Sequence, residues 1–383
     1  MPGEKVMIIF GTRPEAIKMA PVVQALRDSG KVSTKVVVTA QHREMLDQVL
    51  DIFGINPDYD LNIMQEGQSL PEIVTRILQG LETPLKKEKP DLILVHGDTA
   101  TTFAGALSGF YNRIQVGHVE AGLRTNDKYS PYPEEMNRRL TGCLSDIHFA
   151  PLITHKNNLI LEGIPAESIH VTGNTVIDAL LNTAAIPYEF TCPCLSSVNY
   201  EKNRILLVTA HRRENLGKPI QRICKALKTL AETRSDIEVV FPVHMNPAVR
   251  GDVFRILRGV PRVHLLDPVD YRAMVAIMSG CYLVLTDSGG LQEEAPSLNK
   301  PVLVLRDVTE RPEGVDSGTL VLVGTGEERI VSLVKRLLDD EQKYRQMAEA
   351  RNPYGDGQAA LRIRDAILWR LGLTSVVPKD FQA

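Results

Sequence analysis

The sequence predicts an α/β protein made of two parallel-sheet domains of similar size. Short β-rich runs alternate with longer segments of helical apolar spacing, first up to about residue 173 and again after about residue 205. In between, residues 186–203 lose this periodicity, and prolines and polar side chains there indicate a linker or domain crossover. We therefore expect domains at residues 1–173 and 174–358, with residues 359–383 as a C-terminal helical segment that joins the first domain.

The first half carries the strand and helix pattern of a parallel sheet. The expected strands are Val6–Phe10, Lys35–Thr39, Leu92–His96, Gln115–Val119 and Ile147–Ala150. The expected helices are Ala16–Arg27, Arg43–Phe53, Leu70–Leu85, Thr101–Tyr111, Glu134–Leu144, Thr154–Glu162 and Thr175–Asn182. The strands are apolar over most of their length, which is typical of strands covered by helices on both faces.

The same alternation returns in the second half. The expected strands are Ile205–Thr209, Glu238–Val243, Val263–Leu266, Leu283–Thr286 and Pro301–Arg306. The expected helices are Ile220–Ala231, Ala248–Leu257, Arg272–Met278, Leu291–Ala295, Glu328–Leu338, Glu341–Ala350 and Ala359–Leu371. This repetition of βα units predicts a second parallel sheet.

The composition is that of an ordinary soluble globular protein. The 383 residues are 43% hydrophobic and 24% charged. A formal net charge of -3 gives no general reason to bind nucleic acid or a membrane surface. The first residues run directly into a predicted strand, without the apolar core of a signal peptide or a membrane span, so we expect a cytoplasmic protein.

One stretch of the second domain combines a strand, a phosphate-type turn and a short helix. Asp287, Ser288, Gly289 and Gly290 form the turn. The glycines let backbone N–H groups approach an anion closely, and the helix start adds the positive end of its dipole. The turn therefore predicts a phosphate site, and the alternative is an ordinary strand-to-helix turn without a ligand.

Charged residues around this turn extend the prediction. Glu293 and Glu294 would repel a phosphate, so we expect at least one of them to accept hydrogen bonds from sugar hydroxyls. Arg311 follows the next predicted strand and would supply a planar fork for phosphate. Phosphate beside a polyol predicts a nucleotide ligand.

Charged residues also follow the strands of the first domain, where ligands of open parallel sheets bind. Arg13 and Lys18 come after the first strand and would share an anion. Asp98 and Glu120 follow two later strands, and two carboxylates facing one cleft would have separated pKa values that suit acid and base roles. The alternative for Asp98 is capping of the next helix.

Four further residues each have a structural alternative. Glu134 and Glu135 lie in the first turn of a predicted helix, where favourable interaction with the helix dipole is the simpler interpretation. His211 follows a strand and precedes two arginines, so ligand binding and a structural role both stay open. His244 follows another strand and is explained as well by orienting the next turn.

No cofactor motif is present. The first strand is followed by FGTRPE instead of G-x-G-x-x-G, which disfavours NAD, and no P-loop sequence occurs. Cys192 and Cys194 lack further ligands at metal spacing and are assigned to the linker, while Cys143, Cys224 and Cys281 are expected to be buried free thiols. We therefore predict a nucleotide enzyme that needs no metal and no cofactor.

A series of motifs resembles those of the non-hydrolysing bacterial UDP-N-acetylglucosamine 2-epimerases over nearly the whole chain. The motifs, in order, are FGTRPEAIKMAP, HGDTATTFAGAL, VGHVEAGLRT, PEEMNR, TAHRREN, DSGGLQEEAPSLNKPVLVLRD and TERPEG. The resemblance implies two Rossmann-like domains in a GT-B-like arrangement with an interdomain active-site cleft, and a homodimer. It also implies reversible interconversion of UDP-GlcNAc and UDP-ManNAc through loss of UDP to a 2-acetamidoglucal, which would supply N-acetylmannosamine for a cell-surface polysaccharide.

The resemblance assigns roles to particular positions. Substrate contacts carry over to Arg13, Lys18, Asp98, Glu120, His211, Ser288, Gly289, Gly290, Glu294 and Arg311. Catalytic roles carry over to Asp98, Glu120, Glu134 and His211. Val269 and Met274 occupy the uracil-side positions where glutamine and phenylalanine are expected.

The resemblance also implies a second, regulatory UDP-GlcNAc. Its matching positions are Gln41, Gln68, Glu135, Arg212 and His244. Gly67 stands where an arginine is expected, which removes a phosphate ligand from this site. Two alternatives to the main activity stay open, a hydrolysing epimerase that releases ManNAc and UDP, and a retaining GT-B glycosyltransferase, which would need an acceptor.

Overall fold

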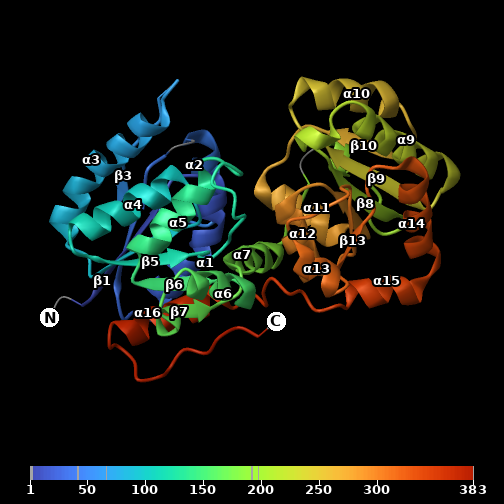
Figure 1. The fold of residues 1–383 in the computed structure, drawn as a ribbon. Coiled ribbons are helices and arrows are strands. Elements are labelled where there is room, and N and C mark those ends of the chain that lie inside the picture. The colour runs from blue at the N-terminus through green and yellow to red at the C-terminus, as the bar shows by residue number, and fades with distance from the viewer. Residues whose placement is uncertain (1–2, 41–42, 66, 191–192, 197, 383) are drawn as a thin grey trace. The chain divides into compact units, whose positions relative to one another are not determined.

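The computed structural model describes residues 3–40, 43–65, 67–190, 193–196 and 198–382. It divides into two compact units, which are described separately. Unit 1 comprises residues 1–179 and 354–383, and unit 2 comprises residues 180–353 (Figure 1). Within the described ranges, no helix is both long and apolar enough to cross a membrane.

Unit 1 is built on a parallel sheet in the order β3-β2-β1-β4-β5-β6-β7 (Figure 1). Its strands are β1 (Lys5–Phe10), β2 (Ser33–Val38), β3 (Tyr59–Asp60), β4 (Leu92–His96), β5 (Gln115–Val119), β6 (Ile147–Ala150) and β7 (Ile169–Val171). Its helices are α1 (Arg13–Ser29), α2 (Arg43–Ile52), α3 (Leu70–Glu88), α4 (Ala100–Tyr111), α5 (Glu134–Leu144), α6 (Ile153–Leu161), the first half of α7 (Thr175–Ala184) and α16 (Ala359–Arg370).

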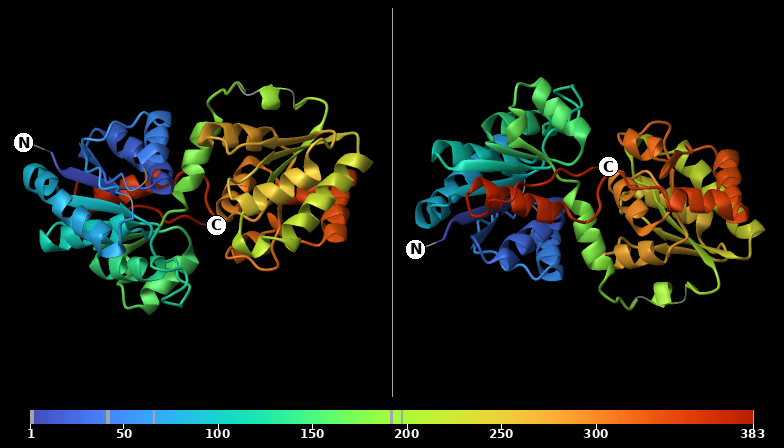
Figure 2. Two further views of the ribbon diagram at one scale, coloured as in Figure 1. Left: turned by 90° about the horizontal axis from the view of Figure 1, so that it is seen from above. Right: turned by 90° about the horizontal axis from the view of Figure 1, so that it is seen from below.

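Apolar burial holds the helices of unit 1 on its sheet. Met7 and Ile9 of β1 and Val95 of β4 are fully buried in one cluster with Ile77 and Leu81 of α3. The end of the chain returns to this unit, where α16 packs against α1, and Figure 2 shows it among the N-terminal elements. Each Leu or Ile side chain buried in this way contributes roughly 1.5–3 kcal/mol to folding.

Unit 2 is a second parallel sheet in the order β10-β9-β8-β11-β12-β13. Its strands are β8 (Arg204–Thr209), β9 (Ile237–Pro242), β10 (Val263–Leu266), β11 (Leu283–Thr286), β12 (Val302–Val304) and β13 (Leu320–Leu322). Its helices are α8 (Pro193–Ser196), α9 (Lys218–Thr233), α10 (Pro247–Leu257), α11 (Tyr271–Gly280), α12 (Gly289–Glu294), α13 (Pro312–Asp316), α14 (Glu327–Asp339) and α15 (Glu341–Ala348). Buried Leu206, Val239, Leu227 and Val334 join the sheet to α9 and α14.

The predicted fold class is confirmed, because each unit is a helix-covered parallel sheet. In both sheets the first strand of the unit lies beside its second strand on one side and its fourth on the other, as in Rossmann folds. Ligands bind such sheets beyond the carboxyl ends of the strands, where this order reverses. In this protein those places follow β1 and β4 in unit 1, and β8 and β11 in unit 2.

Several local predictions were wrong. The short strands β3, β7 and β13 were missed, because two or three residues are too few to show a strand period. Helix α1 begins at Arg13 instead of Ala16, since Glu15 accepts the backbone N–H of Thr12 at 2.8 Å and so starts the helix earlier. The thiol of Cys143 is exposed, because its position on α5 faces outward, whereas Cys224 and Cys281 are buried as expected.

Candidate functional sites of the two units

In unit 1, a charged pair stands at the carboxyl ends of neighbouring strands. Lys18 of α1 binds Glu120, which follows β5, through Nζ and Oε2. Nε2 of His96, the last residue of β4, lies 3.5 Å from the same oxygen. Glu120 also has a left-handed backbone with φ of +62°, a conformation that non-glycine residues adopt mostly at turns and functional sites.

The surroundings of Glu120 keep its carboxylate ionised. Burial alone would raise its pKa, but the positive charge of Lys18 and the contact with His96 hold the pKa well below its ordinary value. The side chain is nevertheless 18% exposed. Glu120 is therefore an ionised carboxylate that a ligand can reach.

The second carboxylate of this edge, Asp98, is paired with an arginine that the sequence analysis missed. Nη2 of Arg138 on α5 binds Oδ2 of Asp98, and Asn137 donates from Nδ2 to the Asp98 carbonyl at 2.9 Å. Arg138 is buried and also lies 3.3 Å from Glu135. Its position three residues after Glu135 on the same helix was the signal that could have identified it.

The adjacent residues Glu134 and Glu135 have different environments. Glu135 is fully buried, accepts the backbone N–H of Thr125 at 3.0 Å and contacts Nε of Arg139 at 3.1 Å. Burial would raise its pKa, but the Thr125 and Arg139 hydrogen bonds lower the pKa below the ordinary value. Glu134 is half-buried, and its side chain makes no hydrogen bond or ion pair to the described residues. Of the two, Glu134 is the one available to a ligand.

In the turn after β1, the carboxylate of Glu15 occupies the backbone N–H groups. Glu15 is buried and accepts the backbone N–H groups of Gly11 and Thr12 at 3.0 and 2.8 Å, and the hydroxyl of Thr99 at 2.8 Å. These N–H groups are therefore not available to an anion. Arg13 is half-buried at the start of α1, with no side-chain hydrogen bond or ion pair to a described residue.

In unit 2, a buried carboxylate organises the turn after β8. Asp287 is fully buried after β11, and its Oδ2 accepts the backbone N–H groups of His211 and Arg212 at 2.8 and 2.9 Å. Asn215 donates to the same oxygen at 2.8 Å. Sequence analysis treated Asp287 only as part of a turn, because the pairing of β8 with β11 is invisible in the sequence.

Two guanidinium groups converge on the start of α12. A Cβ atom on Gly289 would lie 3.6 Å from Nη2 of Arg212 and 3.8 Å from Nη2 of Arg311. Arg311 is held by Glu293, which accepts from its Nε, and Arg212 lies 3.5 Å from Glu310. Two cations beside the first N–H groups of a helix form an anion-binding arrangement.

The remaining predicted residues lie at or near these strand ends. Ser288 caps α12 and donates its backbone N–H to Thr286 at 2.9 Å, and Glu294 is half-buried in the last position of α12. Val269 precedes α11, Met274 lies in its first turns, and both are half-buried. Gly290 lies in the first turn of α12.

Of the residues predicted to bind a second nucleotide, His244 contacts a predicted substrate residue. The rings of His244 and His211 stack with centroids 5.6 Å apart. Gln68 uses its amide within its own loop, donating to the Ile63 carbonyl at 2.9 Å and accepting from Gln65 at 2.8 Å. Gln41 lies outside the described residues.

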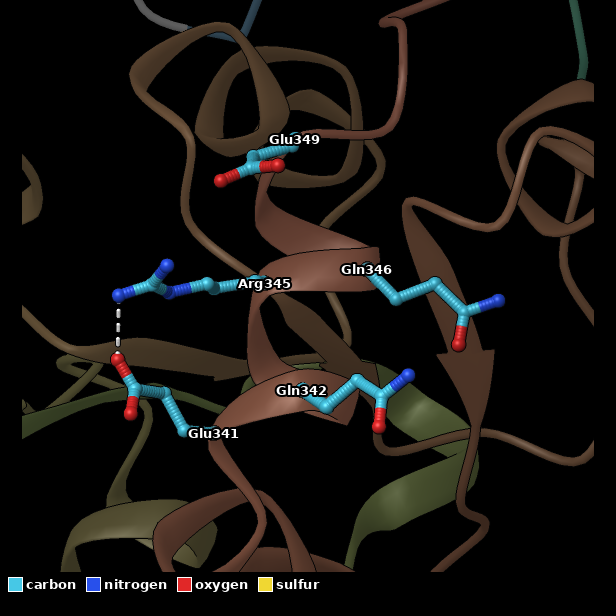
Figure 3. A pocket seen from close by; sticks show the side chains of 5 residues that line it. All are labelled: Glu341, Gln342, Arg345, Gln346 and Glu349. Carbon is cyan, nitrogen blue, oxygen red and sulfur yellow. Dashed lines mark hydrogen bonds and ion pairs between the residues drawn. The ribbon is translucent and has the colours of Figure 1, made fainter.

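A surface hollow in unit 2 lacks comparable chemistry. A surface hollow of about 570 Å³ is lined by Glu341, Gln342, Arg345, Gln346 and Glu349 around α15. Figure 3 shows Glu341 and Arg345 paired on one side of this helix and the two glutamines on the other. In the described part of the chain, no three His, Cys, Asp or Glu side chains are placed to share a metal ion.

Comparison with known proteins gives a consistent result. Residues 24–368 match the family model described as UDP-N-acetylglucosamine 2-epimerase. The UDP-N-acetylglucosamine 2-epimerase of Escherichia coli K12 is 55% identical over 376 residues, covering 95% of this chain and 98% of the relative. A putative UDP-N-acetylglucosamine 2-epimerase from Listeria monocytogenes, solved as a crystal structure, is 51% identical with a TM-score of 0.94, covering 100% of both chains. A UDP-GlcNAc 2-epimerase from Neisseria meningitidis, solved bound to UDP-GlcNAc, is 49% identical with a TM-score of 0.83, covering 95% of this chain and 100% of that one.

Proposed function

The chain belongs to the UDP-N-acetylglucosamine 2-epimerase family, and we propose that it interconverts UDP-GlcNAc and UDP-ManNAc without releasing a free sugar. The observation that carries the proposal is the pair of ligand-accessible carboxylates, Asp98 and Glu120, at neighbouring strand ends of unit 1. A protein that only binds the nucleotide sugar would have little use for them. The UDP-GlcNAc bound to the Neisseria meningitidis relative supports the choice of substrate.

The reaction needs a way to remove an unactivated proton. The hydrogen on C2 of the sugar is not adjacent to a carbonyl, so its direct removal would leave an unstabilised carbanion. Cleavage of the C1–O bond with loss of the C2 proton avoids this, because it gives a 2-acetamidoglucal and UDP. Re-addition of UDP at C1 and of a proton at C2 from the opposite face completes the epimerisation.

We assign proton transfer to unit 1. Asp98, Glu120 and Glu134 are the acid and base candidates, because one group must accept the C2 proton and another must return a proton. Glu120 is ionised beside Lys18 and so can accept a proton, but its lowered pKa makes it a weaker base than an unpaired carboxylate. Arg13 is a candidate to contact the phosphates, since it has no internal partner among the described residues.

We assign the departing pyrophosphate to unit 2. Its negative charge grows as the C1–O bond breaks, and preorganised donors stabilise such charge without reorganisation. His211, Arg311 and the turn from Ser288 to Gly290 are the donors, while Glu294 would accept from a sugar hydroxyl. Val269 and Met274 would contact the uracil through apolar surface and backbone groups.

Proton NMR in deuterated water with UDP-GlcNAc alone tests the proposal. We expect UDP-ManNAc to accumulate to equilibrium, with deuterium at C2 of both nucleotide sugars. Free ManNAc with UDP would identify the hydrolysing alternative. No turnover until a sugar acceptor is added would identify the glycosyltransferase alternative, and retention of the original hydrogen at C2 would rule out the elimination route.

We also propose a second, regulatory UDP-GlcNAc site that uses Arg212 and His244. Of the other matching residues, Glu135 and Gln68 form hydrogen bonds inside unit 1, and Gln41 lies outside the described residues. Gly67 has a φ of +74°, so the arginine expected there would also be strained.

Kinetics in the reverse direction test this regulatory site. UDP-ManNAc alone should react slowly and be activated by trace UDP-GlcNAc. Arg212→Ala should reduce that activation, whereas Arg213→Ala, at the exposed neighbouring position, should not. Full activity without a lag would discard the site.

We further propose that two copies of the chain associate. Met136 and Leu140 lie one turn apart on α5 and are exposed, as are Phe110 and Tyr111 at the end of α4. Burying such side chains in an interface would stabilise a dimer. Light scattering should give about twice the chain mass of 42.5 kDa, and Leu140→Glu should shift it toward the monomer.

A further inference from the structure

The imidazole of His211 lies against the buried carboxylate of Asp287. The strands that precede these residues are neighbours, with Thr209 of β8 paired to Thr286 of β11. Oδ2 of Asp287 accepts from the backbone of His211 and Arg212 and from Asn215 at 2.8 to 2.9 Å. Three donors on one oxygen fix the orientation of the carboxyl group, so that the other oxygen, Oδ1, faces the ring.

Oδ1 needs a proton donor, and the ring can supply one. It is buried and has no hydrogen-bond donor assigned among the described residues, while Nδ1 of His211 lies 3.2 Å away. Burial would raise the pKa of Asp287, but the contacts with His211 and the Arg212 backbone lower it below the ordinary value, so the carboxylate is an acceptor only. A buried carboxylate oxygen without a donor is unfavourable, which favours a proton on Nδ1.

The neighbouring His244 is expected in the other tautomer. Nδ1 of His244 accepts the backbone N–H of Asn246 at 3.1 Å, so neutral His244 carries its proton on Nε2. Its ring stacks on that of His211 with an angle of 17° between the planes. The two imidazole rings are therefore neighbours, but the proton is expected on Nδ1 in His211 and on Nε2 in His244.

We propose that Asp287 is a positioning residue that holds neutral His211 in the tautomer protonated at Nδ1 and so leaves Nε2 available to the ligand. This inference rests on the proposed function only in naming that ligand, the pyrophosphate of a UDP-sugar. A proton taken up at Nε2 from solvent water gives an imidazolium whose charge Asp287 balances from behind. That cation donates from Nε2 to the departing pyrophosphate without a rearrangement of the ring.

Long-range ¹H–¹⁵N NMR of the full chain labelled with ¹⁵N-histidine tests the tautomer directly. His211→Asn assigns the signal, and the spectrum is recorded at a pH where the ring is neutral. We expect the Nδ1-protonated tautomer for His211 and the Nε2-protonated tautomer for His244. A His211 signal of the Nε2-protonated tautomer would overturn the proposal, and this outcome requires no variant of Asp287.

Asp287→Asn should reverse the tautomer. The three donors on Oδ2 will retain the amide oxygen, so the amide N–H₂ faces Nδ1 and forces the proton to Nε2. Asn215→Ser is the matched control, because it removes one donor from the same carboxylate without touching the contact with the ring. It should lower thermal stability and leave the His211 tautomer unchanged, and loss of the tautomer in this control would also count against a specific role of Oδ1.

A double-variant experiment separates positioning from folding. Asp287→Asn should lower kcat by roughly 10- to 100-fold in the wild-type background, less than in Ser-His-Asp enzymes, where the histidine must act as a base. In the His211→Asn background it should have no further effect, because its action passes through the ring. Equal losses in both backgrounds would show a merely structural role. The NMR measurement needs no substrate, so a failure of the proposed epimerase activity would leave the tautomer result standing.

Discussion

The two units use the same edge of the same kind of sheet for opposite charges. In unit 1 the carboxylates are partly exposed, Asp98 by 28% and Glu120 by 18%, and each is paired with a less exposed or similarly exposed cation. In unit 2 the carboxylates are inside, with Asp287 unexposed and Glu293 7% exposed, and they hold His211 and Arg311. This difference in which charge is exposed is why we propose proton transfer for unit 1 and anion binding for unit 2.

The two units also share a feature that occupies the backbone N–H groups of their first turns. A buried carboxylate accepts two consecutive backbone N–H groups in each case, Glu15 for Gly11 and Thr12, and Asp287 for His211 and Arg212. Those donors would otherwise form an anion site. We therefore propose that backbone donors for phosphate come from the start of α12, where two arginines approach Gly289.

The largest expected effect would come from neutralising the unit 1 carboxylates. Glu120→Gln and Asp98→Asn should each lower kcat by about 10²–10⁴-fold, the range that a general acid or base supplies. If the division between units is correct, the affinity for UDP should change little, which titration calorimetry measures alongside kcat. Near-normal turnover in either variant would remove that residue from proton transfer, and a large loss of UDP affinity would break the division itself.

The anion-binding side should show the reverse pattern. Arg311→Ala should weaken UDP binding by roughly 10- to 150-fold, because charge-assisted hydrogen bonds are worth about 1.5–3 kcal/mol. Arg311→Lys keeps the charge but loses the planar fork, so its UDP affinity should lie between those of the wild type and the alanine variant. If UDP affinity were unchanged in Arg311→Ala, the anion site would have to lie elsewhere.

The comparison also shows what sequence alone could predict. The positions of Asp98, Glu120 and His211 beyond strand ends could be predicted, because each follows an apolar run long enough to be recognised as a strand. Asp287 and Arg138 were missed as positioning residues, because their partners come from other strands or helices and depend on pairing that no local pattern encodes. Glu135 matched a ligand position by resemblance, yet its burial against Thr125 and Arg139 could be known only from packing.

A smaller effect should come from replacing His96, which lies beside Glu120 in unit 1. Its Nε2 is 3.5 Å from the carboxylate, and the ring is buried. His96→Gln can still donate from a similar place, whereas His96→Leu cannot. The leucine variant should therefore have a kcat about 2- to 10-fold below that of the glutamine variant, the effect of losing one polar contact of roughly 0.5–1.5 kcal/mol. Equal rates, with equal melting temperatures, would remove His96 from the arrangement.

The smallest effect should be a pH dependence of stability that belongs to unit 1. The folded-state pKa of Glu120 is lowered, against burial, by Lys18 and His96. Its ionised form therefore stabilises the fold above the pKa of the unfolded chain, and this contribution is lost as the pH falls through the folded-state value. The free energy of unfolding of wild type should exceed that of Glu120→Gln at pH 7, and the difference should shrink below about pH 4.5, the ordinary glutamate range.

A surface pair provides the control for that measurement. Glu82 and Lys86 form an exposed ion pair on α3, with side chains 64% and 72% exposed. Glu82→Gln should change the free energy of unfolding by less than about 1 kcal/mol at any pH, since exposed pairs contribute little. The free energies of unfolding are measured by urea titration between pH 3 and pH 8. If Glu120→Gln changed them as little as Glu82→Gln, Lys18 would not stabilise an ionised Glu120. The proposed difference between the carboxylates of unit 1 and unit 2 would then be wrong.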